Sequence, residues 1–179
     1  MTTYVAFLRA INLGPTRKFA KSDIVAATEA AGFDDVTTYI NTGNVRISTT
    51  MRSRSRIEAA LEKAYAEHAG FEVPTIVFSA GELAAVAGEA AELAAERPVL
   101  ERHYLYLLKE EPPTDRVASL LERDGAADAV VVRGRVAHLL LDTYQQGVVD
   151  PWGVEKALGV TATNRNVNVV TTLAQRWCS

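Results

Sequence analysis

Runs of apolar residues alternate with amphipathic stretches along the first 79 residues, and each change of period predicts a change of element. Strands are expected where β-branched and aromatic residues gather, and helices where apolar positions recur every three or four residues. In chain order these are a strand at 3–11, a helix at 21–33, a hairpin of two strands at 36–41 and 45–49, a helix at 55–70 and a strand at 72–79. This β-α-β-β-α-β order is typical of the ferredoxin-like fold, an antiparallel sheet with both helices on one face.

A second copy of this order begins at residue 102. It contains a strand at 102–110, a helix at 113–125, two strands around Gly134 and a short helix at 150–159. The segment after that helix fits either a last strand or a loop and a closing helix. We favour a short strand near Val160–Thr163 and a helix from about Val169 with Asn168 as its cap.

The predicted fold class is therefore α+β, with two ferredoxin-like β-α-β-β-α-(β) halves that arose by duplication and antiparallel sheets with helices packed on one face. The predicted division is a ferredoxin-like half at 1–79, a connecting helix at 80–98, and a second half with the C-terminal helix at 99–179. No linker rich in Gly, Pro or Ser separates the halves, so we expect them to pack as one unit.

Serine and glutamate three residues apart predict where two of the helices begin, because each side chain can cap the other's backbone N–H. Ser55 and Glu58 form one such capping box, and Ser79 and Glu82 form the other at the start of the connecting helix.

Composition limits the function without naming it. The 179 residues are 48% hydrophobic and 23% charged, which is ordinary for a globular protein that needs no metal or disulfide to fold. The net charge of −3 lacks the positive field of a dedicated nucleic-acid binder, so a nucleic-acid partner is not expected. The single cysteine, Cys178, excludes a disulfide within the chain and a Cys-based metal cluster. No signal peptide or membrane-spanning run is recognised, and a soluble bacterial protein of the cytoplasm is expected.

Sequence motifs of well-known enzymes are missing. There is no phosphate-binding P-loop, no dinucleotide-binding glycine motif after a strand, no H-E-x-x-H and no G-x-S-x-G. The three histidines are not spaced as a metal pair, and His103 and His138 are interpreted as satisfied or half-exposed residues of strands. No catalytic residue, metal ligand or cofactor is assigned, and whether the chain is an enzyme stays open.

Three loops carry more hydrogen-bonding side chains than turns require. The third loop also precedes a candidate helix, where backbone N–H groups and an arginine favour an anion. The candidate ligand-binding residues are Arg9 and Asn12 in the first loop, Asn41, Thr42, Gly43 and Asn44 in the second, and Arg165, Asn166 and Asn168 in the third.

These loops lie in three segments, "YVAFLRAINLG", "GFDDVTTYINTGNVRI" and "EKALGVTATNRNVNVV", which resemble the bacterial family called domain of unknown function 1697. Members of that family typically show L-R-G-I-N-V-G-G, T-Y-x-Q-S-G-N-V and T-R-N-W-N-T-V in this order. The resemblance implies an α+β fold, in keeping with the duplicated one, and no particular reaction. Ala10 and Pro15 replace glycines of the pattern, and Val167 replaces its tryptophan, so this chain can differ from relatives in what it binds.

Three interpretations of the polar loops stay open. The side chains can tie turns and cap helices, as asparagine often does. They can instead converge on one cleft for a small anionic ligand or a nucleotide, or serve a nucleic-acid-binding ferredoxin-like module. As a third interpretation, a hydrolase or transferase would use Arg9 or Arg165 to stabilise an anionic transition state, with Asp142 as the nearest base. The oligomeric state is left open.

Overall fold

The computed structural model describes residues 1–143 and 145–178, and position 179, the end of the predicted second half, lies outside the described residues. The chain forms two compact units. The first is Met1–Ala84 with Leu173–Ser179, and the second is Ala85–Thr172. The predicted boundaries at residues 79 and 98 stay a prediction.

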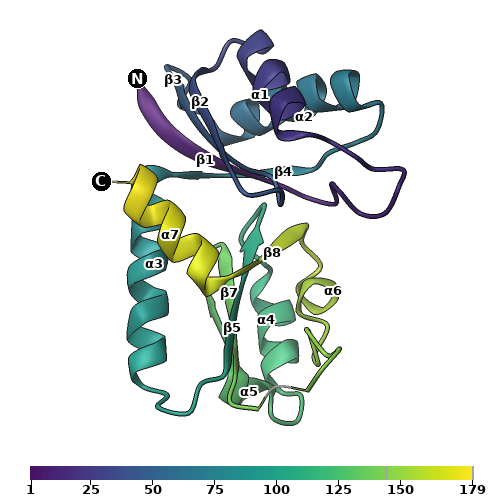
Figure 1. Cartoon of the computed structure of the whole chain (residues 1–179). Helices are drawn as coiled ribbons and strands as arrows, with labels where there is room; N and C mark the ends of the chain where they lie inside the picture. The colour runs from purple at the N-terminus through teal and green to yellow at the C-terminus, as the bar shows by residue number, and fades with distance from the viewer. Residues whose placement is uncertain (144, 179) are drawn as a thin grey trace. The chain divides into compact units, whose positions relative to one another are not determined.

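The first unit has the predicted ferredoxin-like order (Figure 1). Its four strands form an antiparallel sheet in the order β2-β3-β1-β4. The elements are β1 (Thr2–Leu8), α1 (Lys21–Ala30), β2 (Asp34–Tyr39), β3 (Asn44–Thr49), α2 (Arg54–Ala69) and β4 (Thr75–Ser79).

One face of this sheet packs against α1 and α2, and alternate residues of β1 and β3 supply its side of the core. Tyr65 of α2 is fully buried there, with its hydroxyl 2.9 Å from that of Thr28 on α1. The ring of Phe19 meets Tyr65 edge to face at 5.5 Å between centroids. Burial raises the pKa of the Tyr65 phenol far above its ordinary value, so this contact stays neutral.

The second unit repeats the topology. Its antiparallel sheet has the order β6-β7-β5-β8, and this equivalence of two halves fits a duplication. The elements are β5 (Arg102–Leu108), α4 (Thr114–Leu121), α5 (Ala126–Ala129), β6 (Val130–Arg133), β7 (Val136–Leu141), α6 (Val154–Leu158) and β8 (Ala162–Asn166). The predicted α+β fold with two ferredoxin-like halves is confirmed.

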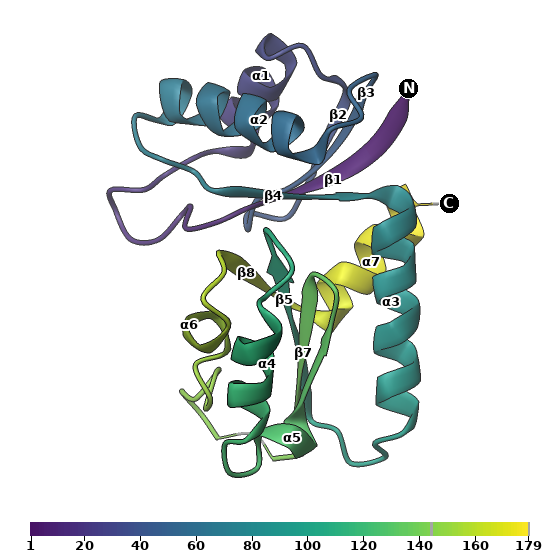
Figure 2. The ribbon, with the colours of Figure 1, turned by 180° about the vertical axis from the view of Figure 1, so that it is seen from behind.

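Two helices, α3 (Ala80–Ala95) and α7 (Val167–Trp177), each begin in one unit and end in the other. Within the second unit, α4 and α6 pack on the face of the sheet that carries Tyr106 and Leu139. Helix α3 covers the opposite face (Figure 2). On that face, Glu89 Oε2 lies 3.7 Å from His138 Nε2. The second sheet therefore has helices on both faces.

Some local predictions hold and others are wrong. The box at Ser79 and Glu82 is confirmed, since the Ser79 N–H donates to Glu82 Oε2 at 2.7 Å and the Glu82 N–H to Ser79 Oγ at 3.2 Å. The box at Ser55 and Glu58 is wrong, because Ser53 caps α2. Glu58 is buried and accepts the Val77 N–H at 3.0 Å, so the sheet takes the carboxylate that the cap would use.

The end of the chain also differs in detail. The last strand is β8 at Ala162–Asn166, and α7 begins at Val167. Asn166 caps this helix in place of the predicted Asn168, because its Oδ1 accepts the Asn168 N–H at 2.9 Å.

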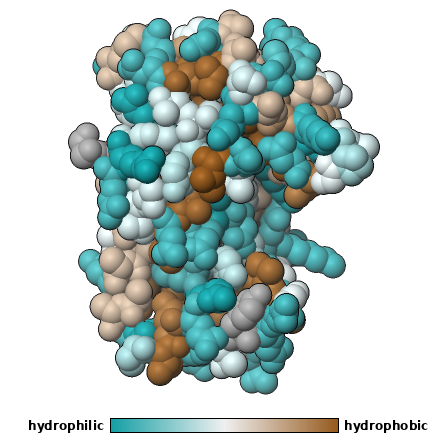
Figure 3. Space-filling model, in the orientation of Figure 1, coloured by the Kyte–Doolittle hydropathy of each residue, from teal (hydrophilic) through white to brown (hydrophobic). Residues whose placement is uncertain are grey.

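The surface carries no large apolar face on the side drawn in Figure 3, where hydrophilic residues predominate and hydrophobic ones form small separate groups. Among the described helices, none has the length and apolar character needed to cross a membrane.

The loop after β1 carries backbone strain at Ala10, whose φ of 56° lies in the left-handed region. That conformation costs a residue with a Cβ about 1–2 kcal/mol, and the family pattern has glycine at this position. We expect Ala10→Gly to raise the free energy of unfolding by roughly 0.5–1 kcal/mol, after the higher entropy of unfolded glycine is subtracted. Urea unfolding followed by circular dichroism measures this change.

Ala118→Gly is the matched control, because Ala118 is an exposed residue within α4. This variant should lose about 1 kcal/mol, the ordinary cost of glycine in a helix. Equal destabilisation of both variants would contradict strain at Ala10.

Candidate functional site

Asn12 joins the first two polar loops within the first unit. Its Nδ2 donates to the Asn41 carbonyl at 2.9 Å and to the Phe19 carbonyl at 3.3 Å, while its Oδ1 accepts the Phe19 N–H at 3.0 Å. The whole amide of Asn12 is therefore used by the backbone around it. This supports the interpretation in which the loop residues tie turns together.

The hairpin turn is held in a similar way. The side chain of Asn44 is fully buried, and its Nδ2 donates to the Tyr39 carbonyl at 3.0 Å and to Thr42 Oγ1 at 2.9 Å. Gly43 has a φ of 75°, and a Cβ there would lie 2.7 Å from Leu8 Cβ, so the turn requires glycine. The Gly43 carbonyl also accepts the Leu8 N–H at 2.8 Å.

Arg9 directly follows β1 and is half-buried. Its backbone N–H donates to the Pro74 carbonyl at 2.8 Å. The structure thus brings the first two polar loops together, while Arg165, Asn166 and Asn168 belong to the second unit. Ligand binding by the residues of the first unit stays a prediction.

Arg165 is a buried cation of β8. Its Nη1 donates to Thr163 Oγ1 and to the Asn164 carbonyl, both at 2.8 Å. Burial lowers the pKa of Arg165 to about 10, so the guanidinium stays charged at neutral pH. These contacts fix the side chain against its own strand.

Asn166 and Asn168 line a cavity of about 360 Å³ inside the second unit. One wall is the small-residue face of α3, which consists of Ala87, Ala90, Ala91 and Ala94. The other walls come from the start of β5 with the two residues before it, from the end of β8 and from the first two turns of α7. Their residues are Leu100, Glu101, Arg102, His103, Asn166, Val167, Asn168 and Thr171.

A chain of three titratable side chains lies behind this cavity. His103 Nε2 is 3.0 Å from His138 Nδ1, and the two imidazoles are 3% and 0% exposed. His138 Nε2 in turn is 3.7 Å from Glu89 Oε2. His103 Nδ1 and His138 Nε2 each have no hydrogen-bond partner among the residues that the structure describes.

Both imidazoles are neutral at physiological pH. Burial lowers the pKa of His103 to about 4, helped by the positive charge of Arg97. Burial likewise lowers the pKa of His138 to about 4, with His103 and then Arg133 adding to the effect. A neutral imidazole has one N–H and one acceptor nitrogen. In the hydrogen bond between the two rings, one ring therefore donates its N–H and the other accepts it.

The carboxylate of Glu89 lies 3.7 Å from His138 Nε2, beyond hydrogen-bond distance, and its negative charge favours one pair of tautomers. It favours an N–H on the facing Nε2 of His138, which leaves His138 Nδ1 to accept the N–H of His103 Nε2. His103 Nδ1 is then a lone-pair acceptor on a residue that lines the cavity. We infer this assignment from the charge of Glu89 and the hydrogen bond between the two imidazoles.

Sequence reasoning assigned His103 and His138 no role. It interpreted them as residues whose hydrogen bonds are satisfied or that are half-exposed, but His103 Nδ1 is buried and has no hydrogen-bond partner among the described residues. The signal that could have found the pair is its position on two strands that the ferredoxin-like order makes neighbours. Asp142, the nearest predicted base, is half-exposed and pairs with Arg97 at 3.2 Å.

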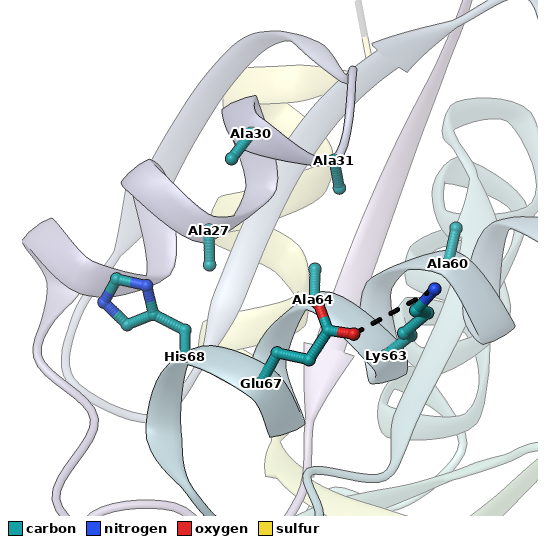
Figure 4. A pocket seen from close by; sticks show the side chains of 8 residues that line it. All are labelled: Ala27, Ala30, Ala31, Ala60, Lys63, Ala64, Glu67 and His68. Carbon is teal, nitrogen blue, oxygen red and sulfur yellow. Dashed lines mark ion pairs between the residues drawn. The ribbon is translucent and has the colours of Figure 1, made fainter.

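A groove between α1 and α2 in the first unit has a larger volume, about 470 Å³, but less chemistry (Figure 4). Five alanines line it together with Lys63, Glu67 and His68. Lys63 and Glu67 pair with each other at 4.0 Å, and His68 lies 3.9 Å from Asp23. Throughout residues 1–143 and 145–178, no three His, Cys, Asp or Glu side chains are grouped to hold a metal ion.

Comparisons with known proteins agree with the fold. The chain is similar to the solved structure of the conserved bacterial protein SP0830 from Streptococcus pneumoniae, with a TM-score of 0.72 and 19% identity over 98% of this chain and 97% of that one. At this identity, the likeness shows the fold alone. No curated protein matches the chain. The model of the family described as "Protein of unknown function (DUF1697)" matches residues 1–138.

The buried histidine pair predicts how stability depends on pH. In the folded chain the pKa values are about 4, below the 6.5 of an ordinary histidine. The unfolded chain therefore binds more protons between these values, and stability falls as the pH drops from 6.5 to about 4. The loss should reach on the order of 3 kcal/mol per histidine, measured by urea unfolding across this range.

The double variant His103→Leu/His138→Leu should remove this part of the pH dependence. His68→Gln is the control, because His68 is half-exposed and should leave the profile unchanged. Persistence of the full profile in the double variant would show that other groups, rather than this pair, cause it.

Asn12 provides a second prediction. Asn12→Ala should lower the free energy of unfolding by about 2 kcal/mol, because it leaves backbone groups of Phe19 and Asn41 without partners. Asn41→Ala is the matched control, since Asn41 contributes its backbone carbonyl to this contact. Similar losses in both variants, measured by chemical unfolding, would contradict the assigned role of the Asn12 amide.

Proposed function

We propose that this chain, which belongs to the DUF1697 family of proteins of unknown function, binds a small anion that also carries a hydroxyl or amino group. The binding site is the cavity of the second unit. The observation that carries this proposal is His103, a buried residue of the cavity wall whose Nδ1 has no partner among the described residues. An unpaired buried acceptor costs free energy, and a ligand that donates to it recovers that cost.

The anionic end of the ligand would meet the start of α7. This helix is 11 residues long, and its first two turns line the cavity through Val167, Asn168 and Thr171. Backbone N–H groups and the helix dipole favour negative charge at such a position. Arg102 lines the same cavity, and its positive charge offsets the negative charge of Glu101, which also lines it. The predicted preference of Asn166 and Asn168 for an anion is kept in this proposal.

The other end of the ligand would donate a hydrogen bond to His103 Nδ1. Because the chain from Glu89 through His138 favours an acceptor at this nitrogen, an O–H or N–H is preferred over a second carboxylate. A hydroxy acid or an amino acid has both groups within a few bonds. The volume of about 360 Å³ suits molecules of that size, at the lower end of ligand pockets.

The small side chain of Val167 supports the proposal that this chain binds a ligand that other members of the family do not bind. It stands where the family pattern has tryptophan, and it lines the cavity. A smaller side chain there leaves room that tryptophan would occupy. Members with tryptophan would then bind a smaller ligand or none.

Binding is favoured over acid–base catalysis at this site. A general base works best when its pKa is close to the working pH, and the pKa of His103 is about 4. His103 would therefore accept a hydrogen bond at neutral pH without taking the proton. We also infer a cytoplasmic location and a small-molecule partner in preference to nucleic acid, from the net charge of −3 and the single cysteine.

The cavity can be tested by filling it. Val167→Trp should abolish binding, while Val99→Trp, at an exposed position, should not. The probes are a panel of small hydroxy acids and amino acids, with acetate as the anion that lacks a donor, read by thermal unfolding. A ligand at 100 times its Kd adds about 2.7 kcal/mol of stability, which moves the midpoint by several degrees.

The expected result is a shift with a donor-bearing acid in the parent and in Val99→Trp, reduced for acetate and absent in Val167→Trp. An equal shift in Val167→Trp would contradict the site. No shift with any member of the panel would contradict the ligand class.

A further inference from the structure

A cationic cavity of about 350 Å³ lies between α4 and α6 of the second unit. It shares no lining residue with the cavity that His103 lines. Of the described residues that line it, Arg116, Arg123 and Lys156 are cations and none is acidic. A chain with a net charge of −3 has no general excess of positive charge to spread over its surface. The cluster is therefore a local feature of this cavity.

Two of these cations come from α4 and the residues after it, and the third comes from α6. Arg116 lies on α4 and Arg123 follows the end of this helix, and both line the cavity. Lys156 is in the last turn of α6. A Cβ placed on Gly159 would lie 3.9 Å from Arg116 Nε, which sets that guanidinium beside the end of α6.

The wall between them is fixed by reciprocal hydrogen bonds. Arg123 Nη1 donates to the Trp152 carbonyl, and Trp152 Nε1 donates to the Asp124 carbonyl at 3.2 Å. The indole also packs near Gly125, where a Cβ would meet Trp152 Cζ2 at 3.7 Å. These contacts tie the end of α4 to the turn before α6, so the cavity does not depend on long unsupported side chains alone.

Three cations that share a wall repel one another, and an anion between them removes this repulsion. Arginine guanidinium groups match the oxygens of phosphate with paired N–H donors, and lysine adds a point charge. Ser119 lines the same cavity and supplies a hydroxyl donor. A carboxylate has two oxygens for this donor set, whereas a phosphate presents three or more.

We propose that this cavity binds the phosphate group of a small phosphorylated molecule, with Arg116, Arg123 and Lys156 as its contacts and Trp152 as a wall for the rest of the molecule. This site is independent of the one proposed for the small anion. A chain that binds both ligands would bring a phosphorylated molecule and a hydroxy or amino acid to one unit.

The test uses inorganic phosphate and pyrophosphate, titrated at constant ionic strength into the full chain and followed by ¹H–¹⁵N NMR spectra. Saturable shifts are expected at the Trp152 indole N–H and at the amides of Arg116 and Ser119. Arg116→Gln and Lys156→Gln should each weaken binding by about tenfold, the effect of one charge-assisted hydrogen bond. Lys63→Gln, an exposed lysine of the first unit, should leave binding unchanged.

Three results would overturn the proposal: no saturable shift, identical shifts with chloride, or equal weakening in Lys63→Gln. A short oligonucleotide that binds more tightly than pyrophosphate and shifts residues well outside this cavity would assign the cations to nucleic acid instead. Val167→Trp should bind phosphate normally, so a failure of the His103 cavity and a failure of this one are separate outcomes.

Discussion

The antiparallel register of β5 with its two neighbours is the constraint on which the second unit depends. Leu105 lies opposite both His138 on β7 and Arg165 on β8, and Tyr104 lies opposite Asn166. His103 is thus diagonal to His138, within reach of an aromatic side chain on the same face. A slip of β5 by one residue would turn His103 to the other face and would separate it from His138.

The two imidazoles of this buried face are neutral, while Arg165 of β8 keeps its charge. An ionised imidazole without a close counter-charge is costly in an apolar interior, and the approach of Arg97 and Arg133 adds to that cost. The carboxylate of Glu89 is partly exposed at the edge, where water offsets its charge. The result is a neutral, hydrogen-bonded pair of imidazoles beside a carboxylate, and the tautomer of His103 sets what its Nδ1 can bind.

The order of elements in both halves could be predicted from apolar periodicity, because each amphipathic stretch has a single way to bury its apolar face. Local ends were less predictable, since Ser53 and Ser55 are equally good caps until the sheet takes Glu58. A helix near Asn166 and Asn168 could be predicted, and both residues line the cavity of the second unit, while their binding of a ligand stays a prediction. The role of His103 could not be predicted, because it depends on strand register, which a single sequence does not determine.

The two units show how a duplicated fold can differ in its chemistry. By strand register, Thr3 of β1 takes the place of His103, and Arg46 of β3 takes the place of His138. Arg46 is half-exposed and donates from Nη1 to the Asp35 carbonyl, so this position in the first unit serves the chain itself. The same topology therefore places a hydrogen bond from Arg46 to β2 in one unit and a buried pair of imidazoles in the other. The fold fixes where side chains meet, and the residues placed there decide whether the meeting point can bind a ligand.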